Sequence, residues 1–375
     1  MRILIVGAGT AGLALAGLLA RRGEAAVVVD RRPHDADLGY AIALWPHGSR
    51  VFHALGVHEE FVAASEPMES YTGRDGSGRT LFSSAMPESI GAFGHLGIIP
   101  REDLLTLLRK PLTSSIDVRD GVGIASLWQS VHEVEVAFDD GTTGTFDLVV
   151  GADGIHSRVR DLTIGRVPDR HTGWGCYVWW ADPSLTPPGA TTERWAAGSF
   201  LGTYPCRDRL CVIAGAPLDT LQSRGRSTRV ASLLTEHGAP ELVDGLPPEN
   251  EPLYLWPMAD VRAPKWVKGR VALLGDAAAA FLPTAGIGAS MALESAAVLA
   301  DELSRTDAGY LPNALDLYVR RRRQRVEAAQ NQSRRLARLM FVRSARLAAV
   351  RDKALLLATM EQMVGPLIKD LREPI

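Results

Sequence analysis

Three glycines near the N-terminus have the spacing of a phosphate-binding turn. Gly7, Gly9 and Gly12 fill the pattern G-x-G-x-x-G, with Thr10 and Ala11 in the same turn. The first glycine permits a sharp turn, the second lets the backbone approach a pyrophosphate, and the third lets a helix pack close to a strand. The free amides at the start of that helix, together with its dipole, would form an anion site.

The flanking residues supply the elements that this turn needs. An apolar run from Ile3 to Val6 predicts a strand before it, and apolar residues at helical spacing as far as Leu19 predict a helix after it. A second apolar run, Ala25 to Val29, ends at Asp30. Its carboxylate is placed to accept hydrogen bonds from a pair of ribose hydroxyls and disfavours a 2′-phosphate. We therefore expect an ADP-containing dinucleotide, FAD or NAD, rather than NADP.

The mostly apolar run from residue 3 to residue 20 admits a second interpretation. Behind a single Arg2, it could be a signal peptide or a short membrane span. The glycine spacing, the pair Arg21 and Arg22 directly after the run, and the second strand-like run favour the dinucleotide interpretation instead.

Composition restricts the classes of protein that fit. A chain of 375 residues suits about two domains. The formal net charge of -2 gives no global attraction to nucleic acid, although the C-terminal third is locally basic. Three cysteines without C-x-x-C spacing indicate neither a disulfide framework nor a zinc site. We expect a reduced, cytoplasmic, metal-free protein that neither spans a membrane nor binds nucleic acid.

Two further segments place polar residues where ligands gather. Two-residue alternation over residues 121–150 predicts an antiparallel ribbon that leads into a buried strand. Asp153 and Gly154 follow that strand, at the carboxyl end where α/β sheets bind ligands. Arg101 stands at the start of an amphipathic helix, an unfavourable place for a cation against the helix dipole, which indicates some other use.

A second glycine-rich helix start lies far along the chain. A buried strand over residues 271–274 ends at Gly275 and Asp276, and after a loop Gly286 and Gly288 open a helix. The bare amides there suit an electron-rich group. The carboxylate of Asp276 could bind a ribose or ribityl hydroxyl.

The middle of the chain and its tail differ in composition and in the secondary structure that they predict. Residues 166–262 combine aromatic residues with strand-like runs, which predicts an antiparallel sheet whose one face walls a pocket. Tyr177 and Trp179, on one face of a strand, and Tyr204 are candidates to line that pocket, although ordinary core packing explains most aromatic residues in a sheet. From Ala314 to about residue 351 the pattern is helical, and the run from Arg320 to Arg323 is typical of a solvated face.

Four separated stretches together resemble a known family. They are GAGTAGLALAGLLARRG with Asp30 and Arg32, IIPREDLL, DLVVGADGIHSRVR, and GRVALLGDAAAAFLPTAGIGASMALESAAVLADEL. The sequence resembles, over nearly its whole length, the single-component FAD-dependent aromatic hydroxylases, which include the para-hydroxybenzoate and salicylate hydroxylases. The combination is far more specific than any one stretch.

The resemblance implies an α/β fold of three parts. A GR2-type, Rossmann-like FAD-binding domain is expected beside an antiparallel β-sheet substrate domain and C-terminal helices. The expected ranges are 1–70, 98–165 and 263–310 for the FAD-binding domain, 71–97 and 166–262 for the substrate domain, and 311–375 for the helices. The resemblance implies no thioredoxin-like domain of the kind found in larger phenol hydroxylases.

The resemblance also assigns cofactor contacts at matching positions. The first glycines would hold the FAD pyrophosphate, the carboxylate after the second strand the adenosine ribose, and the later glycine-rich turn the edge of the flavin ring. The full cofactor set is Gly7, Gly9, Thr10, Ala11, Gly12, Asp30, Arg31, Arg32, Arg101, Asp153, Gly154, Gly275, Asp276, Pro283, Gly286, Ile287 and Gly288.

The activity implied is a monooxygenation. NAD(P)H would reduce the flavin, reduced flavin would capture O2 as a C4a-hydroperoxide, and the distal oxygen would pass to an aromatic or polycyclic molecule. The family commonly has a histidine where this chain has Ala279 and a glutamine where it has Ile287, so no proton relay is carried over. No side chain is assigned as a catalytic acid or base, and the choice between NADH and NADPH and the oligomeric state stay open.

Other functions remain compatible with the sequence. A halogenase of the same fold lacks its expected W-x-W-x-I-P motif here, whereas a flavin-dependent reductase or oxidase is harder to exclude. An NAD-dependent dehydrogenase would leave the second glycine-rich helix start unexplained. A non-catalytic flavin-binding module, with the arginine-rich tail as its contact surface, would bind FAD without turning over NAD(P)H.

Overall fold

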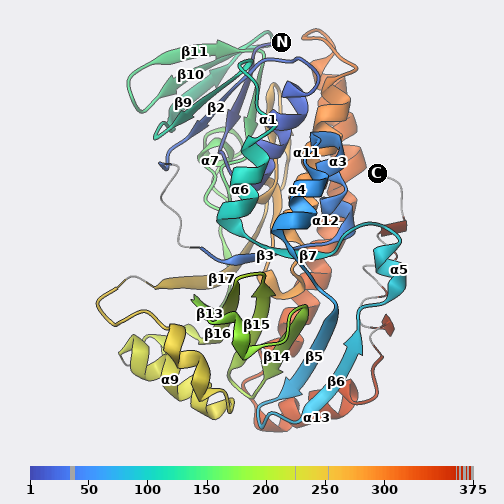
Figure 1. The fold of residues 1–375 in the computed structure, drawn as a ribbon. Coiled ribbons are helices and arrows are strands. Elements are labelled where there is room, and N and C mark those ends of the chain that lie inside the picture. Colours follow the sequence, from blue (N-terminus) through green and yellow to red (C-terminus); the bar gives the residue numbers. More distant parts are fainter. Residues whose placement is uncertain are drawn as a thin grey trace.

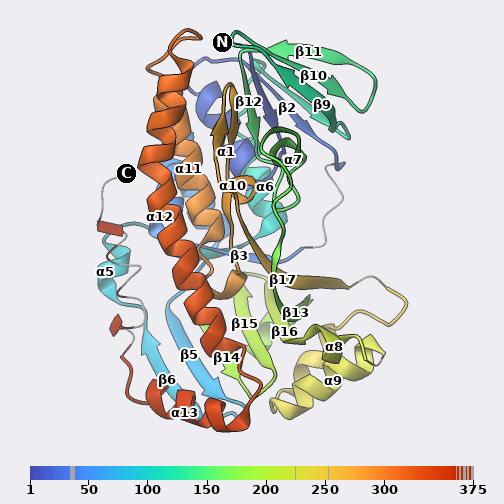
Figure 2. The same cartoon turned by 180° about the vertical axis from the view of Figure 1, so that it is seen from behind.

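The computed structural model describes residues 1–33, 39–223, 225–251, 253–359, 361, 362, 365, 369, 371 and 372. The expected C-terminal region 311–375 therefore lies partly outside the described residues. Figures 1 and 2 show a six-stranded sheet with its helices above a seven-stranded sheet, seen from two opposite sides. In the described part of the chain, no helix is both long and apolar enough to cross a membrane.

The six-stranded sheet is the dinucleotide-binding half that the sequence predicts. Its central strand β1 pairs in parallel with strands on both sides, and a single antiparallel strand closes one edge. Four consecutive buried aliphatic residues make up β1, as expected for a strand covered on both faces. The strand order is β18 (Val267–Lys268), β19 (Val271–Leu273), β12 (Leu148–Gly151), β1 (Ile3–Val6), β2 (Ala26–Asp30) and β8 (Ile116–Asp120).

Helices pack against this sheet and against one another. The helix α1 (Thr10–Ala20) lies between α11 (Gly288–Leu303) and α6 (Arg101–Arg109), and its apolar and small residues are buried almost throughout. Short helices follow in α2 (Pro46–Ser49), α3 (Val51–Leu55), α4 (His58–Ala64), α5 (Glu88–Gly91), α7 (Arg158–Thr163) and α10 (Asp276–Ala279).

The predicted ribbon forms a separate three-stranded antiparallel sheet. Its order is β11 (Thr143–Phe146), β10 (Val134–Phe138) and β9 (Ile124–Gln129). The apolar run after β11 breaks at Asp147, whose carboxylate accepts a hydrogen bond from the backbone N–H of Arg2 at 2.6 Å, and then continues as β12. The ribbon therefore leads directly into the buried strand before Asp153, as expected.

The seven-stranded sheet forms the other half of the molecule. It runs in the order β17 (Tyr254–Arg262), β13 (Arg170–Ala181), β16 (Arg209–Pro217), β15 (Phe200–Cys206), β14 (Ala190–Trp195), β5 (Ser70–Asp75) and β6 (Thr80–Ala85). Its pairs are antiparallel except for the parallel pair of β14 and β5. The helices α8 (Leu218–Leu221) and α9 (Arg226–Glu236) flank it at one side (Figure 2).

A small third element joins the two halves. Strand β7 (Gly97–Pro100) pairs with both β3 (Ala41–Leu44) and β4 (Glu66–Pro67), and β7 also contacts β15 of the large sheet. Arg101 follows β7 directly and begins α6. A strand that touches both halves therefore fixes the position of this arginine.

The described part of the tail is mainly helical, in agreement with the expected C-terminal helices. Helix α12 (Leu311–Met340) runs along the back of both halves, and α13 (Ala345–Leu355) turns beneath the large sheet (Figure 2). The expectation of a solvated arginine run is wrong at Arg322, which is fully buried and pairs with Glu294 of α11 at 2.5 Å. Its neighbour Arg320 is exposed and pairs with Asp316 one turn away. Arg321 also pairs with Asp301 and Glu302 of α11, so two arginines of the run join the tail to the dinucleotide-binding half.

Candidate functional site

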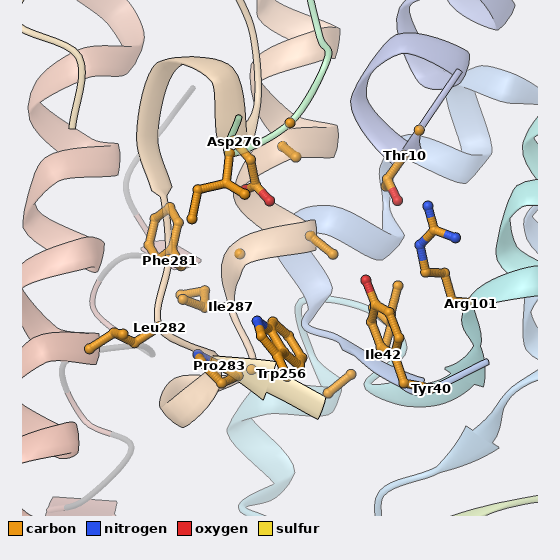
Figure 3. Close-up of a pocket in the computed structure, with 18 of the residues that line it drawn as sticks. Thr10, Tyr40, Ile42, Arg101, Trp256, Asp276, Phe281, Leu282, Pro283 and Ile287 are labelled. Carbon is orange, nitrogen blue, oxygen red and sulfur yellow. The ribbon is translucent and has the colours of Figure 1, made fainter. Parts of the chain in front are cut away.

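One long cavity of about 1120 Å³ lies between the two halves of the molecule. Its lining begins at the first glycine-rich turn and Asp30, and it ends on the face of the seven-stranded sheet around Tyr204. Apolar surface predominates in the lining, as is usual for a small-molecule site. Figure 3 shows part of this lining, with Thr10, Arg101 and Asp276 around one open space.

The three glycines of the first turn have distinct roles. A Cβ atom on Gly7 would lie 2.3 Å from the carbonyl oxygen of Ala152, and one on Gly12 would lie 1.9 Å from the carbonyl oxygen of Gly7. No heavy atom lies within 4 Å of the position that a Cβ atom on Gly9 would take. Gly7 and Gly12 therefore permit close backbone packing, whereas Gly9 leaves open space; Gly12 itself lies outside the cavity lining.

The carboxylate of Asp30 is held by one backbone N–H group from the first glycine-rich turn and one from its own turn. It accepts hydrogen bonds from the backbone N–H groups of Ala8 at 2.8 Å and Arg32 at 2.9 Å, one on each oxygen. Each oxygen keeps a further lone pair, so the carboxylate can still accept from a diol. Arg31 and Arg32 line the cavity beside it.

Arg101 and Asp276 carry opposite charges at the middle of the cavity. Arg101 is buried at the first position of α6, and its guanidinium carbon lies 5.8 Å from the centre of the Tyr40 ring. Asp276 begins α10 and lines the cavity with an exposed side chain, and desolvation by the surrounding protein raises the pKa of its carboxyl to about 6 despite the nearby Arg101. The site therefore offers a hydrogen-bond donor and an acceptor across the space that Figure 3 shows.

Asp153 lines the cavity, but its carboxylate is turned to its own helix. One oxygen accepts from the hydroxyl of Ser157 at 2.5 Å and the other from the backbone N–H of Val159 at 3.0 Å. Burial raises the pKa of this carboxyl, and the two hydrogen bonds oppose the rise. Asp153 thus shapes the loop before α7, and Gly154, with a φ of +80°, presents that loop to the cavity.

Arg160 is a structural residue of the site that sequence reasoning did not single out. Its buried guanidinium donates to the backbone carbonyls of Ala277 at 3.2 Å and Ile155 at 2.7 Å. It therefore joins the loop after β12 to the helix that begins at Asp276. Its place in the stretch DGIHSRVR was the only signal, because spacing alone does not distinguish it from Arg158.

The later glycine-rich turn forms the next part of the wall. Pro283, Gly286, Ile287 and Gly288 all line the cavity, and α11 begins at Gly288. Gly286 has a φ of +58°, a left-handed conformation that favours glycine. Gly275, with a φ of +60°, lies outside this lining and lets α10 approach α1.

Aromatic residues that the sequence did not identify close this part of the cavity. The rings of Trp256 and Tyr40 lie 5.3 Å apart between centres, and both line the cavity. Figure 3 shows Trp256 beside Pro283 and Ile287, and Tyr40 beside Ile42 and Arg101. The signal was weak, because aromatic residues are frequent throughout the large sheet.

Of the three aromatic residues expected to line the substrate pocket, only Tyr204 does so. Tyr177 and Trp179 share one face of β13, but this is the face that packs against α9, and the indole N–H of Trp179 donates to the carbonyl of Leu242 at 3.2 Å. The expectation for these two residues is wrong because strand alternation groups side chains by face without telling which face meets the cavity.

Metal chemistry finds no support among the described residues. No group of three or more histidine, cysteine, aspartate or glutamate side chains there could hold a metal ion. Cys176, Cys206 and Cys211 are all unpaired and buried, and burial raises the pKa of the Cys211 thiol to about 12. None of the three is a reactive thiolate.

Known proteins share both the sequence pattern and the fold. Residues 1–333 match the model of the family described as FAD binding domain. The chain is 31% identical over 348 residues to 3-amino-4-hydroxybenzoate 2-monooxygenase of Streptomyces cremeus, covering 90% of this chain and 87% of that protein. It is 30% identical over 308 residues to 2-heptyl-3-hydroxy-4(1H)-quinolone synthase of Pseudomonas aeruginosa, covering 80% of each.

Solved structures agree on the fold. Klebsiella pneumoniae HpxO complexed with FAD and uric acid matches with a TM-score of 0.88 at 23% identity, covering 99% of this chain and 96% of that one. P. aeruginosa PqsL in complex with 2-aminobenzoylacetate matches with a TM-score of 0.81 at 24% identity, covering 94% and 99%.

The chain belongs to the FAD binding domain family, because the family model matches most of its length. It is an FAD-dependent oxidoreductase of the monooxygenase class.

Proposed function

We propose that this protein inserts one oxygen atom of O2 into an aromatic small molecule, with NAD(P)H as the electron donor. The observation that supports this most directly is the continuous cavity, which joins two glycine-rich helix starts to an apolar end on the large sheet. An NAD-only site would use the first turn and leave the second without a ligand. A flavin dinucleotide is long enough to use both.

The residues present fit FAD. The open space beside Gly9 admits a pyrophosphate, Asp30 retains lone pairs for a ribose diol, and Arg101 and Asp276 face the middle of the cavity. We propose that the remaining cavity-lining positions of the predicted set contact the cofactor as well. Gly12 and Gly275 act through packing instead.

When bound, FAD supplies the capacity to accept a hydride and to activate dioxygen. The two electrons of NAD(P)H allow one oxygen atom to enter the substrate while the other leaves as water. The protein's own contribution is to hold the ring of the substrate near the flavin and to exclude water. Trp256, Tyr40 and Ile287 form an apolar wall suited to that task.

The same proposal covers organisation and location. The strand content of the two sheets supports the division into an FAD-binding part (1–70, 98–165, 263–310) and a substrate-binding part (71–97, 166–262). Three unpaired cysteines support a cytoplasmic location, where thiols stay reduced.

The test is the visible absorption spectrum of the purified protein during a cycle of reduction and oxidation. NAD(P)H added without oxygen should bleach a yellow protein, and oxygen should restore the colour. A ring substrate should then gain one oxygen atom from labelled O2. Formation of hydrogen peroxide with no oxygenated product from any ring compound would favour an oxidase, and a colourless protein that FAD cannot reconstitute would refute the proposal.

A further inference from the structure

A buried carboxylate forms part of the cavity wall on the large sheet. Glu193, on β14, is 7% exposed and lines the cavity. Its Oε1 accepts from the hydroxyl of Tyr204 at 2.6 Å, and its Oε2 accepts from the indole N–H of Trp195 at 2.8 Å. Burial, together with the nearby carboxylate of Glu193, raises the pKa of the Tyr71 hydroxyl. Among the described residues, no cation forms an ion pair with Glu193, so its negative charge is balanced by neutral donors only.

These hydrogen bonds fix what the wall can offer a ligand. A tyrosine hydroxyl has one proton, and Tyr204 donates its proton to Glu193, so the oxygen of Tyr204 retains only acceptor capacity. Burial and the adjacent carboxylate hold the pKa of Tyr71 and of Tyr204 well above the ordinary value, so both keep their proton. The N–H of Trp195 is already used. The cluster of Glu193, Tyr204 and Trp195 therefore presents acceptors to a ligand and no free donor.

The sheet is built to bring this carboxylate to the cavity. Glu193 pairs with Gly73 on β5 and with Gly202 on β15, so neither cross-strand neighbour has a side chain to cover it. A Cβ atom on Gly202 would lie 2.6 Å from the ring and hydroxyl of Tyr204, and one on Gly73 would lie 2.2 Å from the ring of Phe82. The two glycines make room for rings that lie across the sheet beside the carboxylate.

Apolar side chains surround the cluster. They come from β6, β7, β16, α12 and the segments next to β5 and β6, and comprise Met68, Phe82, Met86, Ile98, Ile213 and Leu336. A polar group placed among them must find its partners within the cluster, because unmet hydrogen bonds are costly away from water.

We propose that Glu193, with Tyr204, is the group that selects the substrate, and that it selects neutral or cationic rings bearing N–H or O–H donors. A substrate with a carboxylate in the same position would bring its negative charge next to that of Glu193. It would also face hydrogen-bond acceptors without a donor to bind it. The inference rests on the proposed function, which it deepens by naming the substrate class. It separates this chain from its relative from Streptomyces cremeus, which is named for a benzoate.

The test uses three probes of the same shape that differ in charge and donors: benzamidinium, benzamide and benzoate. Calorimetry measures their dissociation constants with the FAD-loaded protein. We expect benzamidinium to bind at least about tenfold more tightly than benzoate, with benzamide between them, since a hydrogen bond to a charged group is worth that much or more. Glu193→Gln should remove most of the difference, because its amide also donates to a carboxylate.

A matched control separates position from charge. Glu60→Gln removes the same charge from an exposed site on α4, outside the cavity, and should leave the order of the three probes unchanged. If Glu193→Gln does not retain FAD, Glu193→Met removes the acceptor with a side chain of similar length, and the same loss of preference is expected. Equal affinities, a preference for benzoate, no binding of benzamidinium, or an unchanged preference in the Glu193 variants would overturn the proposal.

The assay also keeps the two proposals apart. Probe binding needs only the oxidised holoprotein, whereas the proposed function is tested by NAD(P)H oxidation and oxygen transfer. A protein that binds benzamidinium preferentially yet transfers no oxygen would refute the proposed activity and still support the role of Glu193 in recognition. A protein that transfers oxygen but binds the three probes equally would support the activity and refute the role of Glu193 in recognition.

Discussion

The two ends of the cavity differ in what forms the site: backbone at the dinucleotide end and side chains at the substrate end. At the dinucleotide end, backbone geometry determines the site: Gly7 and Gly12 permit packing distances that no side chain would tolerate, and Gly9 leaves space for a ligand. At the substrate end, side chains of neighbouring strands meet around Glu193. A site made of backbone is set by a local pattern, whereas a site made of side chains depends on which strands become neighbours.

The largest expected effect tests the dinucleotide end of the cavity, where backbone packing determines the site. Gly12→Ala would place a methyl group 1.9 Å from the carbonyl oxygen of Gly7, a clash with backbone that no rotamer relieves. We expect the free energy of unfolding of the apoprotein to fall by about 3 kcal/mol, despite the better helix propensity of alanine. Denaturant unfolding of the apoprotein measures it.

The neighbouring position supplies the contrast. Gly9→Ala meets no atom within 4 Å, so the apoprotein should unfold within about 0.5 kcal/mol of the parent while its affinity for FAD falls. Normal stability of the Gly12 variant, or full FAD affinity in the Gly9 variant, would show that the turn does not divide its roles in this way.

The second prediction concerns pH at the middle of the cavity. A ribityl hydroxyl that donates to Asp276 favours the charged carboxylate, whose pKa is about 6 without the ligand. FAD affinity should therefore rise with pH through 6, with a dissociation constant about tenfold lower at pH 7 than at pH 5. Fluorescence titration of apoprotein with FAD measures this, and Asp276→Asn should flatten the curve.

Apoprotein stability should show the opposite trend from this group. Because burial raises the pKa of Asp276 in the folded state, the folded state binds the proton more tightly than the unfolded state between the ordinary value and about 6. Its contribution to stability is therefore present at low pH and lost as pH rises through that window. An FAD affinity that is independent of pH in the parent protein would remove Asp276 from the cofactor site.

The contrast between the ends also explains what the sequence could predict. Strand, turn and helix at Gly7 and the glycine-rich start at Gly288 follow from spacing within a few residues, and the structure confirms both elements. The face on which Trp179 lies and the burial of Arg322 depend on packing partners far along the chain. Glu193 gave no signal, because its significance comes from glycines on two strands that only the fold makes adjacent.

The smallest expected effect tests the substrate end of the cavity, where side chains determine the site. Tyr204→Phe keeps the ring but leaves the buried Oε1 of Glu193 without that donor, so the free energy of unfolding should fall by about 1 kcal/mol. Tyr177→Phe makes the same chemical change on the opposite face of the sheet, against α9, and should cost less. Thermal unfolding of the two FAD-loaded variants compares them directly. Equal losses in the free energy of unfolding would mean that the hydrogen bond from Tyr204 to Glu193 adds nothing to stability. Packing of the rings alone would then determine the structure of the substrate end.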